Sequence, residues 1–68
     1  MSHRQLYWRT AARVCTNAEL QALTLKHQRG LGYYRIGLTL DISRSAARDR
    51  IRTAEQKIAA ALTKETAA

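Results

Sequence analysis

The chain has 68 residues, and its 12 Lys and Arg against 5 Asp and Glu give a formal net charge of +7. A chain of this length builds one small core and buries only about 60% of the surface of its unfolded form, which excludes a multi-domain enzyme. Residues 1–68 are therefore expected to form a single, strongly basic domain, and the absence of proline leaves its helices free to run.

Charged side chains interrupt every apolar stretch, so the sequence predicts neither a membrane-spanning helix nor a signal peptide. We therefore expect a cytoplasmic protein with no membrane partner. Cys15 is the only cysteine, and with His3 and His27 it makes no zinc-binding pattern, so no metal and no cofactor are expected. Cys15 is interpreted as a small buried side chain and His27 as a helix-end residue.

The N-terminal segment, residues 1–15, is predicted to be a helix. Ser2 followed three residues later by Gln5 forms a capping box, and residues 3–14 contain no helix breaker. One broad face of this helix carries the apolar residues Tyr7, Trp8, Ala11, Ala12, Val14 and Cys15. This face is expected to pack on the rest of the domain. The alternative is a homodimer contact, because Trp and Tyr favour interfaces.

A second helix is predicted over residues 17–29. Thr16 and Glu19 form its capping box, in which each side chain satisfies an N–H of the first turn. Gly30 suits the left-handed position just past a helix end, and Leu31 is placed to fold back onto that helix.

Residues 32–40 are predicted to form a short third helix, with Ile36 and Leu40 on one face. Gly37 lies inside it, where glycine costs about 1 kcal/mol relative to alanine, so we expect another backbone to approach closely there.

The last helix is predicted to run from Arg44 to Leu62 after a very short turn, with Ser43 as its N-cap. Its apolar residues recur at spacings of three and four and share one stripe: Ala47, Ile51, Ala54, Ile58 and Leu62. The tail, residues 63–68, is expected to fray.

Two helices joined by so short a turn indicate a helix-turn-helix. Gly37 and Ala47 are expected to face each other where these helices cross. Leucine at position 37 would then force the helices apart, whereas alanine would be neutral or better.

The residues 16–62 resemble region four of bacterial sigma factors, and the related small helix-turn-helix proteins of bacteriophages and actinobacteria. The similarity lies in the segments NAELQALTL, GLGYYRIGLTLDIS and SRSAARDRIRTAEQKIAAAL. The resemblance implies an all-α domain of four helices with a C-terminal helix-turn-helix and a long recognition helix. It also implies a transcriptional regulator, acting as repressor, activator or accessory factor. Asp41 departs from the glycine usual in the turn, and we do not expect a complete sigma factor, because no promoter-melting region accompanies the domain.

The resemblance places five residues at the groove-facing positions of the recognition helix, and these are expected to contact bases: Arg44, Ser45, Arg48, Asp49 and Arg52. Asp49 has a second interpretation, as an ion-pair partner of Arg52. Seven further residues are expected to contact phosphates: Arg4, Arg9, Arg13, Tyr34, Arg35, Arg50 and Gln56. Double-stranded DNA is accordingly the expected partner.

The alternative function is a protein-interaction module that binds RNA polymerase or a host factor through the Tyr7 and Trp8 face. An enzyme is not expected. The sequence contains no plausible pair of nucleophile and base and no phosphate-binding loop, and its carboxylates are isolated.

Overall fold

The computed structural model describes residues 2–66 and, among these, the side chains of residues 2–64. Over this range the chain is all-helical, as expected, without strands. Its four helices are α1 (His3–Val14), α2 (Asn17–His27), α3 (Tyr33–Leu40) and α4 (Arg44–Thr66).

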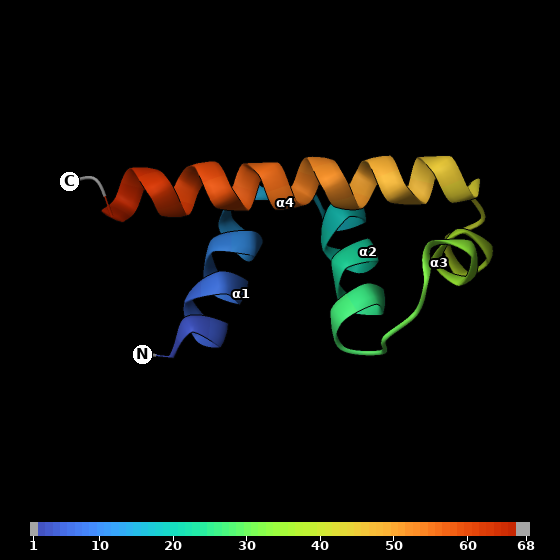
Figure 1. Ribbon diagram of the computed structural model, residues 1–68, viewed down its shortest axis with the longest axis horizontal. Coiled ribbons are helices and arrows are strands. Elements are labelled where there is room, and N and C mark those ends of the chain that lie inside the picture. The colour runs from blue at the N-terminus through green and yellow to red at the C-terminus, as the bar shows by residue number, and fades with distance from the viewer. Residues whose placement is uncertain (1, 67–68) are drawn as a thin grey trace.

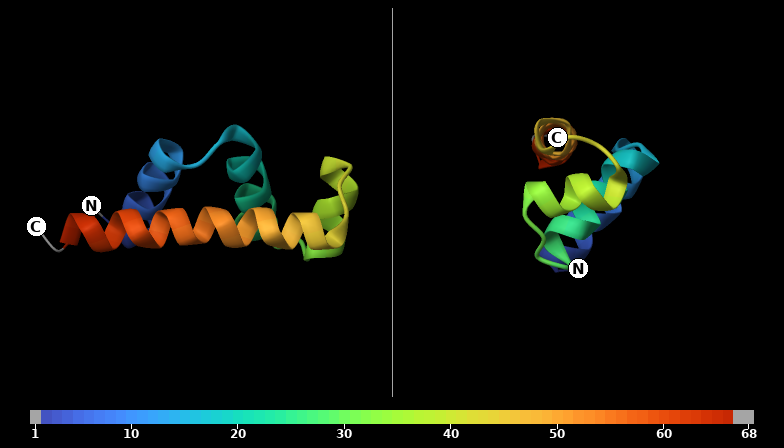
Figure 2. Two further views of the ribbon diagram at one scale, coloured as in Figure 1. Left: turned by 90° about the horizontal axis from the view of Figure 1, so that it is seen from above. Right: turned by 90° about the vertical axis from the view of Figure 1, so that its right-hand side faces the viewer.

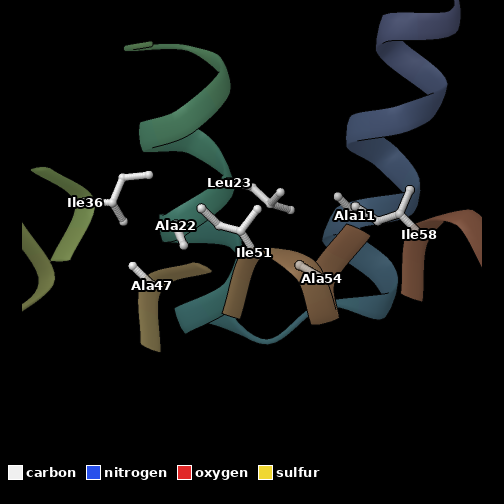
Figure 3. Close-up of a cluster of buried hydrophobic side chains, with 8 residues drawn as sticks. All are labelled: Ala11, Ala22, Leu23, Ile36, Ala47, Ile51, Ala54 and Ile58. Atoms are coloured by element: carbon white, nitrogen blue, oxygen red, sulfur yellow. The ribbon is translucent and has the colours of Figure 1, made fainter. Parts of the chain in front are cut away.

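Helix α4 lies along one edge of the molecule, and α1, α2 and α3 all pack on one side of it (Figures 1 and 2). The core forms where the three shorter helices meet α4 (Figure 3). Half of its eight fully buried apolar residues come from α4: Ala11, Ala22, Leu23, Ile36, Ala47, Ile51, Ala54 and Ile58. The apolar stripe predicted on α4 is thus confirmed, with Leu62 packed against the core at its end.

Both predicted capping boxes are present. The Ser2 hydroxyl accepts the Gln5 backbone N–H at 3.2 Å, and the Thr16 hydroxyl accepts that of Glu19 at the same distance. The Glu19 carboxylate in return accepts the Thr16 N–H at 2.8 Å. These bonds satisfy N–H groups that a helix start leaves without partners, which is why α1 and α2 begin where the sequence indicates.

Two helix ends differ from expectation. Helix α2 stops at His27, two residues early, and the chain then turns through the left-handed Gly30, so that the Leu31 N–H reaches the Leu25 carbonyl at 3.1 Å. Helix α4 continues to Thr66, four residues beyond the predicted end at Leu62, and residues 67–68 lie outside the described range. No helix breaker follows Leu62, and its packing on the core supports the added turn.

The expected close approach at Gly37 is confirmed, but its partner is different. A Cβ on Gly37 would lie 2.7 Å from the carbonyl oxygen of Ile42 and 3.3 Å from that of Ser43, so the turn backbone, and not Ala47, fills this space. The turn folds back because Asp41 adopts a left-handed φ of 58° and the Ile42 N–H bonds the Gly37 carbonyl at 2.8 Å. The expectation that alanine fits here is therefore wrong.

A charged pair joins α2 to α4. Lys57 Nζ lies 2.9 Å from Glu19 Oε1, and Glu19 is only 8% exposed. The hydrogen bond from the Thr16 backbone N–H, helped by Lys57, holds the pKa of the Glu19 carboxyl below its usual value. The pair thus stabilises the folded state only while Glu19 is ionised.

Glu19→Gln is expected to lower the free energy of unfolding by about 1 kcal/mol at pH 7, because glutamine keeps the capping geometry but not the charge. Because the folded-state pKa is lowered, the contribution of Glu19 is complete above the unfolded-state pKa of about 4.3 and disappears as the pH falls through the folded-state value. Urea unfolding across this pH range measures it. The matched control is Asp49→Asn, which removes an exposed carboxylate. A Glu19→Gln deficit that stayed constant with pH would contradict the assignment.

Candidate nucleic-acid interface

The N-terminal half of α4 is strongly basic, and the face turned away from the core is uncovered. Residues 44–52 contain four arginines and one aspartate. The helix starts abruptly at Arg44 because the Ser43 hydroxyl accepts the Ala46 N–H at 3.0 Å. Seen along its axis, α4 forms a corner of the molecule, with the other helices all to one side (Figure 2). A positively charged helix surface is therefore open to a large partner.

Four polar residues form the outermost line of α4, which we call the crest: Ser45, Asp49, Arg52 and Gln56. They are all exposed, and the turn of about 100° per residue places them opposite the buried stripe. Three of the five residues expected to contact bases thus lie on the crest. Gln56, expected to contact a phosphate, lies there too, one turn beyond Arg52.

The other two expected base contacts, Arg44 and Arg48, lie on the flank of α4 that faces the start of α3. With Ser45 and Tyr33 they line a shallow depression, which we call the hollow. Tyr33 is half-buried, and Lys26 Nζ stands 5.5 Å from the centre of its ring. Tyr33 is not among the site residues that the sequence predicts, because its ring is interpreted there as a partly buried part of the core.

The structure places Asp49 beside Arg48, whereas the sequence suggested Arg52 as its ion-pair partner. Its Oδ1 lies 3.9 Å from Arg48 Nε, and no ion pair with Arg52 forms among the described side chains. The Arg48 and Asp49 side chains are 57% and 67% exposed, so the attraction between them is weak and easily replaced.

The residues expected to contact phosphates are divided between the two ends of the molecule. Tyr34 and Arg35 are exposed on α3, and Arg50 is half-buried on α4, as expected for a stem that lies on the core. Helix α1 carries Arg4, Arg9 and Arg13, and it packs where Ala11 meets Ile58 (Figure 3). Ile58 lies 14 residues beyond Arg44, or about 21 Å along α4, so the structure does not bring the α1 arginines to the N-terminal end of α4.

The aromatic face of α1 packs within the chain. Tyr7 and Trp8 are half-buried, and their rings meet edge to face at 5.5 Å between centroids. The ring of His27, at the end of α2, lies 6.0 Å from that of Tyr7 and 6.1 Å from that of Trp8. Oε2 of Glu55, on α4, lies 3.7 Å from Lys26 Nζ and 3.7 Å from His27 Nε2. Burial, followed by the charge of Glu55, raises the pKa of Tyr7.

Cys15 is half-buried, and its Sγ lies 3.8 Å from the Ala54 carbonyl oxygen. Burial raises the pKa of this thiol, which makes it a poor nucleophile. Within residues 2–66, no three His, Cys, Asp or Glu side chains converge on a point that could hold a metal ion. None of the helices in this range has the length and apolar character needed to span a bilayer.

Comparisons of the chain with protein-family models, with curated proteins and with solved structures found no match.

Proposed function

We propose that the chain binds double-stranded DNA sequence-specifically through a helix-turn-helix made of α3 and α4, and that it acts as a transcriptional regulator. The observation that carries this proposal is the exposed side of the N-terminal half of α4, where no other helix covers the polar crest or the flanking side chains of Arg44 and Arg48. An α-helix with its side chains is about 10–12 Å wide, which matches the roughly 12 Å width of the major groove.

The turn before α4 supports the same proposal. Asp41 in its left-handed conformation and the close approach at Gly37 let α3 and α4 meet within three residues. This short connection leaves the N-terminus of α4 at one end of the molecule, directly over α3 (Figure 1). In the proposed complex, this end of α4 enters the groove while Tyr34 and Arg35 of α3 contact the phosphate backbone.

The roles of the crest residues follow from their chemistry. Arg52 offers two parallel donors to a guanine edge, Asp49 accepts from a cytosine amino group, and Ser45 serves either base type. The contact of Asp49 with Arg48 is weak enough to be exchanged for a base. Binding of RNA polymerase or of a second copy of the chain at the Tyr7 and Trp8 face stays a prediction. The half-buried rings of this face already pack against His27 within the chain.

Selection of bound duplexes from a random DNA pool, at a stated salt concentration, identifies the preferred site. Arg52→Ala is then expected to weaken binding to that site by about 1–3 kcal/mol and to weaken binding to random duplex much less. Arg35→Ala is the matched comparison and is expected to weaken both equally, because a phosphate contact carries no base identity. Both variants must melt like the parent. Equal losses for Arg52→Ala on the two duplexes would show that the crest does not read bases.

A further inference from the structure

We infer that the hollow formed by Tyr33, Arg44, Ser45 and Arg48 binds one phosphate group of the DNA backbone. This inference rests on the proposed function and deepens it, because it gives Arg44 and Arg48 a different task from that of the crest. The sequence alone placed both arginines among the base contacts. Their position on the flank, against the start of α3, points instead to the edge of the groove.

Every side chain that lines the hollow can donate a hydrogen bond, and none is acidic. Two are permanent cations whose planar, forked donors match the oxygens of a phosphate. The Tyr33 and Ser45 hydroxyls add two neutral donors. Several hydrogen-bond donors close together, with no carboxylate among them, are the composition expected for an anion-binding site.

The spacing of the two arginines strengthens this inference. Arg44 and Arg48 are four residues apart and therefore neighbours on the same side of α4, where like charges repel. In the part of the chain that the structure describes, no carboxylate lies within ion-pair distance of Arg44, and Asp49 approaches only the Nε of Arg48, at 3.9 Å. A phosphate between the two guanidinium groups would relieve their repulsion.

As a consequence, neighbouring residues of the first turns of α4 contact different parts of the DNA. Arg44 and Arg48 hold the helix to the rim of the groove, Asp49 and Arg52 face the bases, and Ser45 lies between the two sets. Arg48→Gln should therefore weaken binding to the selected site and to random duplex by the same factor, in contrast to Arg52→Ala.

The test replaces single phosphates of the selected duplex, one at a time, with neutral methylphosphonates. At one position, we expect the replacement to lower the affinity of the parent protein about tenfold and to lower that of Arg48→Gln, which keeps only one of the two guanidinium groups, clearly less. Arg29→Gln is the matched control. It removes an exposed cation outside the hollow, so it should keep the full sensitivity at that position. Thermal melts establish that each variant is folded.

A second arm separates the sources of the phosphate. Inorganic phosphate, titrated against chloride at constant ionic strength, should shift the backbone amide resonances around Ser45 in the parent and not in Arg48→Gln. If DNA is bound but no position is both phosphonate-sensitive and dependent on Arg48, the inference fails while the proposed function stands. If inorganic phosphate binds but duplex DNA does not, both the proposed function and the assignment to the DNA backbone are overturned.

Discussion

Replacement of Gly37 by leucine is expected to unfold most of the protein, and replacement by alanine to destabilise it measurably. A single Cβ at this position would lie 2.7 Å from the Ile42 carbonyl oxygen, closer than real Cβ atoms come to their neighbours. The obstacle is backbone held by the Ile42 N–H bond to the Gly37 carbonyl and by the Ser43 carbonyl's bond to the Ala47 N–H, so it cannot move aside freely.

Whether alanine stabilises or destabilises the protein depends on the size of two opposing effects. Overpacking costs about 1–3 kcal/mol, and a contact of 2.7 Å with hydrogen-bonded backbone belongs in the upper part of this range, above the gain of about 1 kcal/mol in helix propensity. A net loss of up to about 2 kcal/mol corresponds to a fall in Tm of several degrees for a chain of this size. Leucine adds three more carbons to the same contact, and its cost approaches the total stability of about 3–10 kcal/mol expected for 68 residues.

Thermal melts of both variants measure this, with Gly32→Ala as the matched control. Gly32 is the N-cap of α3, and nothing lies within 4 Å of a Cβ placed there, so alanine should cost only the difference between a good and a poor cap residue, about 0.5–1 kcal/mol. A Gly37→Ala protein as stable as the parent would mean that the turn does not approach α3 as described.

Binding to duplex DNA is expected to weaken about a thousand-fold between 50 and 200 mM salt. Each neutralised phosphate contributes about −0.9 to the slope of log affinity against log salt, and about five to seven of the chain's cations can reach phosphates. Most of these cations are arginines, whose charge does not depend on pH near neutrality. The slope should therefore be the same at pH 6 and pH 8.

Fluorescence anisotropy of a labelled random duplex across this salt range measures the slope. Arg44→Gln should reduce its magnitude by about one phosphate's share. Asp49→Asn should leave it close to that of the parent, because it alters a base-facing residue. An affinity that did not change with salt would exclude DNA as the main partner and favour a protein partner at the Tyr7 and Trp8 face.

The helices themselves could be predicted closely because their signals are local. The capping boxes at Ser2 and Thr16 each specify a helix start through bonds within a few residues, and the glycine at position 30 marks the end of α2 to within two residues. The C-terminal end of α4 could not be placed in this way. No glycine or proline marks it, and the packing of Leu62 against distant parts of the core extends the helix.

The site could be predicted as a list of residues, but not as an arrangement. Helical periodicity identifies the side of α4 that faces away from the core, so Ser45, Asp49 and Arg52 are on the crest as expected. Periodicity does not tell where α3 meets α4, and this junction alone decides that Arg48 lies beside Tyr33. The same limit applies to Gly37, whose neighbour is the turn rather than the facing helix.

The position of α4 in the chain also bears on how the protein folds during synthesis. Half of the buried apolar residues belong to this helix, which leaves the ribosome after α1, α2 and α3. Until α4 emerges, α1, α2 and α3 lack the helix against which they pack. Helices of 8 to 12 residues are only marginally stable alone in water. The nascent chain must therefore keep Leu23 and Ile36 hydrated until residues 44–58 emerge, and folding begins as a late, concerted event rather than helix by helix.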